Sequence, residues 1–340
     1  MFYKEKQYIC KLNGLYRLYM IKRTTNYCLL ALGLFGGVSL KAQDAEFTQF
    51  YANPLYLNPA FAGTARCPRF CLNYRNEWPG FYKTYITYSA SYDQHFDNLS
   101  GGIGLLVTND HAGNGTINTT DASFIYSYQL NVSREFSLKF GLQGTFHQKS
   151  LDWTKLTFGD MIDRRRGFVY NTGEIPNGYP IMTRRAADVS AGILGYSKRY
   201  FFGFAAHHLT QPDEAFIGNS SPLPMKFTGH AGAVIPLQKN DEVYISPNIL
   251  YQYQGQFQQL NIGMYFVKNN VVAGLWYRNQ DAVIVLFGYQ THNFKFGYSY
   301  DVTVSKLAPV SAGSHEISIQ ILLNCRPKHK KFRTVSCPSF

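Results

Sequence analysis

Histidines are the residues of this sequence with the widest range of chemistry, and four of them are candidates for a metal or catalytic site: His207, His208, His230 and His315. His207 and His208 are adjacent, so a strand would point them to opposite faces and they could not bind one metal ion together. Ser314, His315 and Glu316 are also neighbours, and a strand would turn the histidine away from the other two. No HExxH, CxxC or glycine-rich phosphate loop occurs. The sequence therefore predicts a protein that is not an enzyme and has no metal or cofactor.

Two further sets of side chains are candidates for binding a partner. The aromatic set lies in "FTQFYANPLYLNPAFAGT", residues 47–64, and comprises Phe47, Phe50, Tyr51, Tyr56 and Phe61. The two Asn-Pro steps predict an irregular, non-helical chain, because proline restricts the residue before it to extended conformations. The basic set lies in the longest predicted loop and comprises Arg164, Arg165, Arg166, Arg184 and Arg185. These arginines could bind acidic lipopolysaccharide or an acidic patch on a partner, or they could simply be solvated.

Four cysteines follow the N-terminal region: Cys67, Cys71, Cys325 and Cys337. An even number in an exported chain permits disulfides. Cys67 and Cys71 are roughly 13 Å apart if the chain is extended, which is too far for them to pair with each other. We predict that one of them bonds Cys325 or Cys337 and joins the first strand of the fold to the last. Free thiols are the alternative.

The sequence divides into a targeting segment, a lead-in, a body and a tail. An apolar run, "YCLLALGLFGGVSL", preceded by basic residues and followed by "KAQ", predicts a secretory signal peptide over residues 1–43, with Met20 as an alternative start. We call residues 44–65 the lead-in and expect it on the periplasmic side. Residues 66–325 form the body. Residues 326–340 form a basic periplasmic tail that either contacts peptidoglycan-linked partners or anionic phosphates, or is a disordered end.

Charge is concentrated outside the body. The formal net charge is +12, of which residues 1–43 carry +6 and the residues after Cys325 carry +5. Residues 44–325 are left with +1. A basic surface for nucleic acid is therefore not predicted.

Apolar and polar residues alternate with a period of two along most of the body. In "FSLKFGLQGTF", residues 136–146, phenylalanine and leucine occupy one face while serine, lysine and glutamine occupy the other. Such segments, about ten residues long, number fourteen and start near residues 66, 81, 99, 117, 134, 186, 199, 225, 242, 256, 270, 281, 292 and 314. An even number of strands of this length is typical of outer-membrane proteins. We predict an all-β, transmembrane, antiparallel up-and-down β-barrel surrounded by outer-membrane lipid, with Trp276 and Tyr277 in an aromatic girdle.

The predicted connections support this architecture. Those after even-numbered strands are all tight, such as "NVS", "KRY" and "QTH". Those after odd-numbered strands include the long run 150–185, although three of them, near "WPG", "YQGQ" and "RNQD", are short. Short turns on the periplasmic side and longer loops outside are the pattern of outer-membrane barrels, and both termini would then face the periplasm. A secreted β-sandwich also alternates and is the alternative fold.

The sequence resembles a known family in several segments. "FTQFYANPLYLNPAFAGT" resembles the start of the mature region of the PorP/SprF family, the type IX secretion system membrane proteins of Bacteroidetes. Similar segments include "YRNEWPG", "FGDMID", "HHLTQP" and "YSYDVTVSKLAPVSAGSHEISI", so the resemblance extends over residues 47–319. No single motif is decisive, but their order and spacing are specific.

This resemblance implies a non-enzymatic role in the outer membrane. Such a protein would support export or surface anchoring of particular cargo proteins, including gliding adhesins. It would associate with other components of the type IX machinery on the periplasmic side, and its lead-in would pack into or under the mouth of the barrel. A passive pore for small solutes, built on the same barrel, is the alternative function.

Overall fold

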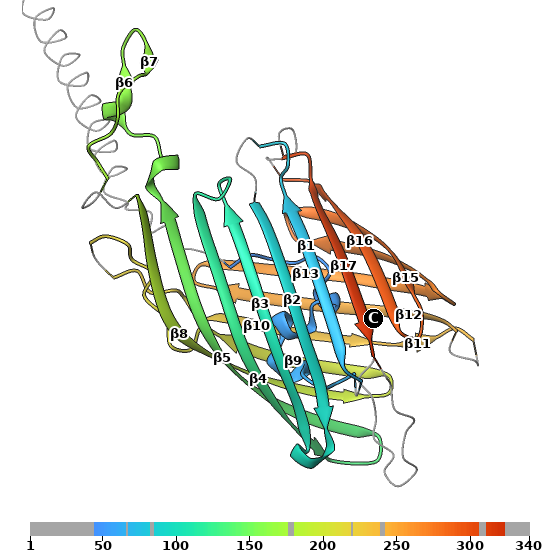
Figure 1. The fold of residues 1–340 in the computed structure, drawn as a ribbon. Coiled ribbons are helices and arrows are strands. Elements are labelled where there is room, and N and C mark those ends of the chain that lie inside the picture. The colour runs from blue at the N-terminus through green and yellow to red at the C-terminus, as the bar shows by residue number, and fades with distance from the viewer. Residues whose placement is uncertain are drawn as a thin grey trace, which may run out of the picture. The chain divides into compact units, whose positions relative to one another are not determined.

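A closed ring of antiparallel strands forms the fold. The computed structural model describes residues 44–65, 67–81, 85–175, 180–218, 220–238, 242–305 and 311–323. Within these residues, fourteen strands make the wall (Figure 1): β1 (Arg69–Glu77), β2 (Tyr85–Phe96), β3 (Gly101–Ala112), β4 (Ile117–Asn131), β5 (Phe136–Asp152), β8 (Ile181–Ser197), β9 (Tyr200–His207), β10 (Lys226–Ala233), β12 (Val243–Gln254), β13 (Phe257–Lys268), β14 (Val271–Arg278), β15 (Ala282–Gln290), β16 (Phe294–Thr303) and β17 (Ser314–Leu322). The predicted fold class is confirmed.

Two pairings close the ring. β1 lies antiparallel to β17, which joins the first strand to the last, and β10 pairs with β12. Between β10 and β12 in the chain lies β11 (Ile235–Pro236), which pairs with the first residues of β12. A separate two-stranded hairpin, β6 (Ile162–Asp163) and β7 (Gly167–Phe168), lies in the connection between β5 and β8. Every other wall strand pairs with the next wall strand in the chain.

The observed strand starts differ from the predicted ones by a few residues, and β8 differs most. It begins at Ile181 rather than near residue 186, because its pairing with β5 continues to Asp152. Arg184 and Arg185 therefore belong to a strand and not, as predicted, to the longest loop.

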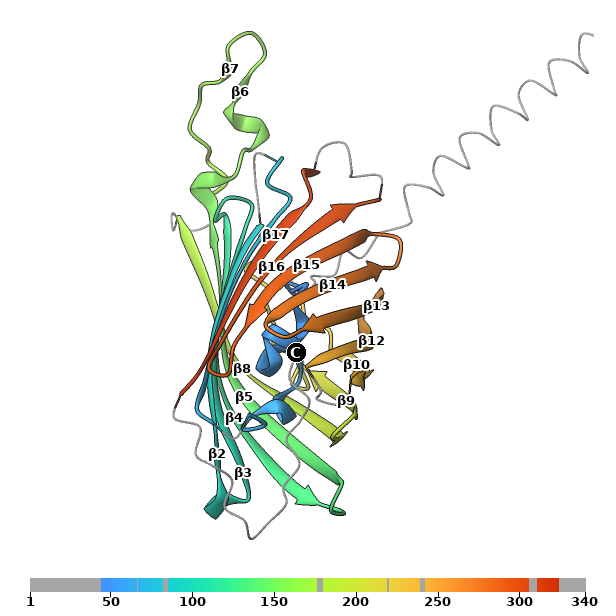
Figure 2. The same ribbon diagram turned by 90° about the vertical axis from the view of Figure 1, so that its right-hand side faces the viewer.

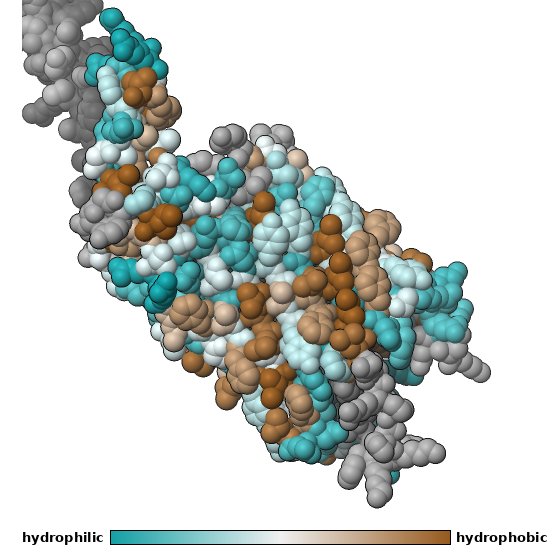
Figure 3. Space-filling view, viewed as in Figure 1, coloured by the Kyte–Doolittle hydropathy of each residue, from teal (hydrophilic) through white to brown (hydrophobic). Residues whose placement is uncertain are grey.

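Side chains alternate between the two faces of the wall as the sequence predicts. In β5, Phe140 and Leu142 are exposed on the outer face, whereas Lys139 and Gln143 point into the lumen and are buried. Figure 3 shows hydrophobic side chains across the outer face of the wall, between more hydrophilic ends. An apolar band of this kind matches the hydrocarbon layer of a bilayer.

The two ends of the barrel differ in their connections. We call one the long-loop end, because the connections 153–180 and 208–225 lie there. The opposite end is the short-turn end, where β4 and β5 are joined by residues 132–135 and β8 and β9 by residues 198–199.

The lead-in runs through the lumen from one end to the other. At the long-loop end the Asp44 amide donates to the Gln254 side chain at 3.1 Å, and at the short-turn end the Arg69 guanidinium donates to the Thr64 hydroxyl at 3.3 Å. Figure 2 shows the lead-in between the two sides of the wall. The sequence predicts a periplasmic segment that packs into or under the mouth of the barrel. In the structure the segment lies inside the lumen and extends along it, where it packs against apolar wall residues such as Trp276.

Short helical turns, rather than a purely irregular chain, make up the lead-in: η1 (Phe50–Ala52), α2 (Pro54–Leu57) and η2 (Pro59–Phe61). Both prolines stand at the first helical position, where their missing amide is not needed. Further single turns are η3 (Asp97–Leu99), η4 (Trp153–Lys155) and η5 (Gly159–Met161). None of the helices in the described residues is long and apolar enough to cross a membrane.

Candidate functional site

The aromatic side chains of the lead-in pack against the inner wall of the barrel. Phe47, Phe50, Tyr51 and Phe61 are each at most 7% exposed. The Phe50 ring lies 5.3 Å from the Trp276 ring, edge to face, and the Tyr51 ring lies 5.4 Å from the Phe201 ring. Full burial of an aromatic side chain contributes about 1.5–3 kcal/mol. The lead-in is therefore held as part of the core.

Tyr56 is partly buried and fixes the first residues of the lead-in. Its hydroxyl donates to the Ala45 carbonyl at 2.5 Å, its ring lies 5.1 Å from the Phe47 ring, and Lys226 of the wall lies 5.4 Å above it. These contacts fold the lead-in back on itself near the long-loop end.

Glycines in the wall make room for the lead-in backbone. A Cβ at Gly141 would lie 2.4 Å from the Ala60 nitrogen, and one at Gly102 would lie 2.4 Å from the Ala62 carbonyl oxygen. Real Cβ atoms do not approach backbone this closely, so only glycine fits at these two positions. The wall is thus shaped to the lead-in.

Buried charges bind the first half of the lead-in. The Glu316 carboxylate accepts from the Thr48 and Gln49 amides at 2.5 and 3.1 Å, and it pairs with Arg75 at 3.4 Å. Asp301 accepts from the Thr48 hydroxyl at 2.8 Å and pairs with Arg75 at 3.0 Å. All of these residues are buried, and hydrogen bonds to ionised groups are about twice as strong as neutral ones.

A second buried ion pair holds the last residues of the lead-in at the short-turn end. The Arg69 guanidinium donates to both oxygens of Asp93, at 2.7 and 3.0 Å. The same carboxylate accepts from the Gly63 amide at 2.7 Å. The Ala62 carbonyl accepts from the Ser127 hydroxyl at 2.6 Å and from Lys139. The lead-in is thus fixed at both ends.

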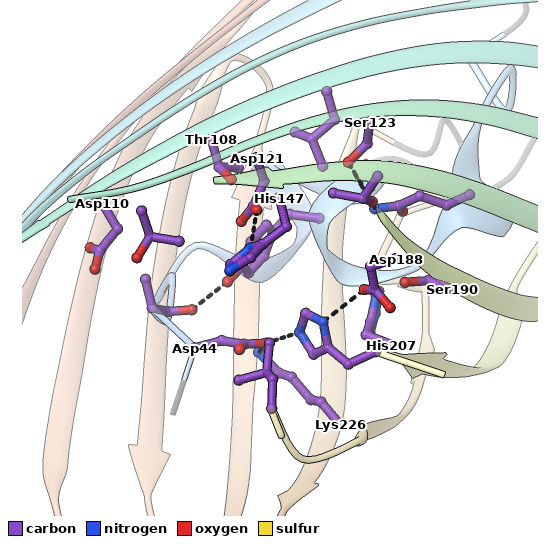
Figure 4. Close-up of a pocket in the computed structure, with 18 of the residues that line it drawn as sticks. Asp44, Thr108, Asp110, Asp121, Ser123, His147, Asp188, Ser190, His207 and Lys226 are labelled. Atoms are coloured by element: carbon purple, nitrogen blue, oxygen red, sulfur yellow. Dashed lines mark hydrogen bonds and ion pairs between the residues drawn. The ribbon is translucent and has the colours of Figure 1, made fainter. Parts of the chain in front are cut away.

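A polar cavity of about 100 Å³ lies at the long-loop end, where Asp44, Ala45 and Tyr56 of the lead-in form part of its lining (Figure 4). Asp44 of the lead-in and Asp188 of the wall accept from His208 at 2.9 and 2.8 Å, and Asp44 also lies 3.5 Å from Lys226. On the opposite side His147 bridges Asp121 and Glu214, at 2.6 and 3.0 Å.

The ion pair between His208 and Asp44 shifts the pKa values of both residues. Burial lowers the pKa of His208, but the two flanking carboxylates outweigh it and raise this pKa to about 10. Burial likewise raises the pKa of Asp44, but His208 and Lys226 outweigh it and hold this pKa well below its usual range. The imidazolium and the Asp44 carboxylate therefore both stay charged at neutral pH.

Comparison with known proteins identifies the family. Residues 39–321 match the family described as type IX secretion system membrane protein PorP/SprF. The chain belongs to the PorP/SprF family. This family and the closed barrel with its apolar outer face place the protein in the outer membrane. None of the curated proteins matches the chain.

Solved structures similar to this PorP/SprF protein are outer-membrane barrels of low sequence identity. The Ralstonia pickettii toluene transporter TbuX is 11% identical, with 85% of this chain and 98% of that chain covered and a TM-score of 0.48. The Pseudomonas putida toluene transporter TodX is 12% identical, with 81% and 93% covered and a TM-score of 0.44. A Pseudomonas aeruginosa FadL homologue is 13% identical, with 78% and 93% covered and a TM-score of 0.41.

The predicted basic set does not converge with the aromatic set. Arg164, Arg165 and Arg166 are exposed in the β6–β7 hairpin, where the Arg165 and Arg166 amides donate to Asp163. Arg184 and Arg185 are exposed near the start of β8. Partner binding by either set stays a prediction for this PorP/SprF chain.

The cysteines fall into two kinds. Cys67 is disulfide-bonded, whereas Cys71 is a free, buried thiol beside Gln320. Cys325 and Cys337 lie outside the described residues. β1 and β17 are neighbours, as the predicted bond between the first and last strands requires, but the identity of the bonded partners stays a prediction.

The histidine and tryptophan predictions need correction. His207 and His208 line the same cavity, because His208 follows the end of β9 with a left-handed φ of 57° and so escapes the strand alternation. Trp276 points into the lumen at 1% exposed and so is not in the girdle, whereas Tyr277 is exposed on the outer face. Within the described chain no group of three or more His, Cys, Asp or Glu side chains could hold a metal ion.

The charged lumen residues Arg75, Asp301 and Glu316 were not predicted as site residues. Their signal is a charge at the inward position of an alternating strand, as in "FKFGYSYD", where Asp301 shares a face with Lys295 and Ser299. A single inward charge is equally compatible with a water-filled lumen. Only the three-dimensional arrangement shows that these charges share partners with the lead-in.

Proposed function

We propose that this protein is a plugged outer-membrane anchor of the type IX secretion system, which supports the export or surface attachment of particular secreted proteins such as gliding adhesins. The observation that carries the proposal is the fixation of the lead-in at both ends of the lumen, by Glu316 and Asp93. A barrel filled in this way is a rigid platform rather than a passage.

The difference between the two ends assigns partners to each side. Barrels of this kind place long loops outside the cell and short turns in the periplasm. The exposed β6–β7 hairpin and the start of β8 would then face the secreted cargo. The short-turn end would face the components of the machinery in the periplasm.

A passive pore for small solutes is the competing function. The aromatic packing of Phe50 and Tyr51 against the wall, and the glycines shaped to the lead-in, favour a closed lumen. A pore would also have no need for ion pairs that bind an internal segment at two points.

Affinity purification of the tagged full-length protein from native envelope tests the anchor. We expect a surface-exposed secreted protein and other type IX components to co-purify. The matched control is an unrelated outer-membrane barrel carrying the same tag in the same cells. Purification of the barrel alone, combined with steady conductance in planar bilayers, would support the pore instead.

A further inference from the structure

In the described part of the wall, β8 has a long edge without a partner strand. β8 pairs with β5 along its full length but with β9 only over residues 191–196. β9 ends at His207, and residues 181–190 of β8 extend past that point. In the part of the chain that the structure describes, no strand pairs with this side of residues 181–190. The loop after β9 covers the last residues of this stretch, where the Thr210 hydroxyl donates to the Ala187 carbonyl at 3.3 Å. We call the remaining residues, 181–185, the β8 edge.

The odd-numbered residues of the β8 edge direct their backbone groups away from β5. The Leu209 amide, beyond the end of β9, donates to the Val189 carbonyl at 3.0 Å, which fixes this parity. Because backbone direction alternates along a strand, Ile181, Thr183 and Arg185 present their N–H and C=O groups to the same side. None of these three residues makes a backbone hydrogen bond on that side among the described residues.

A groove follows the β8 edge. It has a volume of about 240 Å³ and is lined by Ile181, Met182, Thr183, Arg184 and Phe216. In Figure 1 this part of β8 runs beside β5 at the end of the barrel from which the β6–β7 hairpin projects. An unpaired edge cannot lie in the hydrocarbon layer, since its polar groups would have no partner there. The β8 edge therefore lies beyond the bilayer, at the long-loop end.

We propose that the β8 edge binds an extended, acidic segment of a secreted cargo protein by strand addition. The proposal rests on the anchoring function above and specifies how the cargo is held. An open strand edge binds extended chain through main-chain hydrogen bonds, and neighbouring side chains give specificity. Arg184 and Arg185 are exposed on this edge, and Arg164, Arg165 and Arg166 lie in the preceding loop, so an acidic segment is complementary in charge.

Two other occupants fit less well. If two copies of the chain paired through this edge in antiparallel registers centred on Arg184 or Arg185, these arginines would lie directly opposite each other, and like charges in that position are destabilising. Lipopolysaccharide would neutralise the arginines but would not use the exposed backbone groups of Thr183 and Arg185.

Thr183→Pro tests the backbone contribution. Proline removes the N–H that faces the open side, and the β5 ladder does not use this N–H because its parity is opposite. Thr183→Val is the matched control, since it keeps the N–H and has a similar shape. Arg185→Glu tests the charge without changing the backbone. Each variant of the full chain carries a photo-crosslinking residue at the exposed Ile181 position and is irradiated in the native envelope of the producing cells.

We expect Thr183→Val to crosslink to a secreted surface protein through a segment with more Asp and Glu than Lys and Arg. Thr183→Pro and Arg185→Glu should each lower this crosslink at least tenfold, while heat-modifiable gel migration shows that all barrels are folded. Equal crosslinking by Thr183→Pro and Thr183→Val overturns the proposal. So does a crosslink to lipopolysaccharide or to a second copy, or no crosslink at all.

Failure of the β8 edge as the cargo-binding site can be distinguished from failure of the anchoring function. Cargo that still co-purifies with Thr183→Pro would leave the anchoring function in place and reject the β8 edge as its binding site. Absence of cargo from the unmodified protein as well would reject the anchoring function itself.

Discussion

Replacing Glu316 by alanine should release the first half of the lead-in from the wall. The Glu316 carboxylate is fully buried, accepts from the Thr48 and Gln49 amides at 2.5 and 3.1 Å, and pairs with Arg75 at 3.4 Å. Alanine removes all three interactions. Arg75 keeps Asp301, at 3.0 Å, as its closest carboxylate.

The size of the effect follows from these contacts. Hydrogen bonds to charged groups contribute about 1.5–3 kcal/mol each, and removing one partner of a buried ion pair costs about 3–5 kcal/mol. The contributions overlap, so we expect the free energy of docking of residues 44–53 to weaken by about 3–5 kcal/mol. Since 1.4 kcal/mol is a factor of ten, the ratio of docked to undocked lead-in should fall at least about a hundredfold.

Two measurements report this release. Single-channel recording in planar bilayers should show openings for Glu316→Ala, and hydrogen exchange at the Thr48 and Gln49 amides should accelerate. Glu135→Ala is the matched control, because Glu135 is exposed at the short-turn end, away from the lead-in. If Glu316→Ala shows no channel openings and unchanged hydrogen exchange at these two amides, Glu316 does not hold the lead-in against the wall.

Three further variants probe the lead-in and the lipid face. Gly141→Val should displace the lead-in and give channel conductance, because a Cβ at this position would clash with the lead-in backbone. The control Gly144→Val, which has open space around it, should give no conductance, and equal conductance of the two variants would contradict the steric argument. The raised pKa of His208, about 10, means that its ion pair with Asp44 stabilises docking fully below about pH 6.5 and is lost as the pH rises through about 10. Proteolysis of the lead-in should therefore increase over that window, and His208→Gln should abolish the dependence; an unchanged pH profile in His208→Gln would count against the pair. Leu142 is 61% exposed on the outer face, so Leu142→Arg should lower the unfolding free energy in lipid vesicles by about 2–4 kcal/mol, and no change would contradict its contact with lipid.

Most of the wall could be predicted from the sequence, because a bilayer forces every crossing strand to alternate between lipid and lumen. The exception is instructive. Residues 181–185 of β8 carry Thr183 and Arg185 at outward positions, since this stretch extends past the lipid and is not constrained by it. The alternation of apolar and polar residues stops there, so the sequence predicts a later start for this strand although its backbone pairing continues.

The interior could not be predicted in the same way. The Thr48 amide and the Glu316 carboxylate are 268 residues apart in the chain, so no local spacing indicates that they meet. Trp276 suggests an aromatic girdle because an inward tryptophan is unexpected in a polar lumen. The inward position of Trp276 is explained by the lead-in, because the Phe50 ring packs against the Trp276 ring inside the lumen. The left-handed backbone of His208 likewise has no signal in the sequence around it.

Conductance of the unmodified, full-length protein in planar bilayers tests the central claim most directly, with a variant lacking residues 44–62 recorded beside it. If the lead-in fills the lumen, the unmodified protein shows no steady current and the deletion variant forms a stable open channel. A steady open conductance from the unmodified protein, equal to that of the deletion variant, would contradict the account.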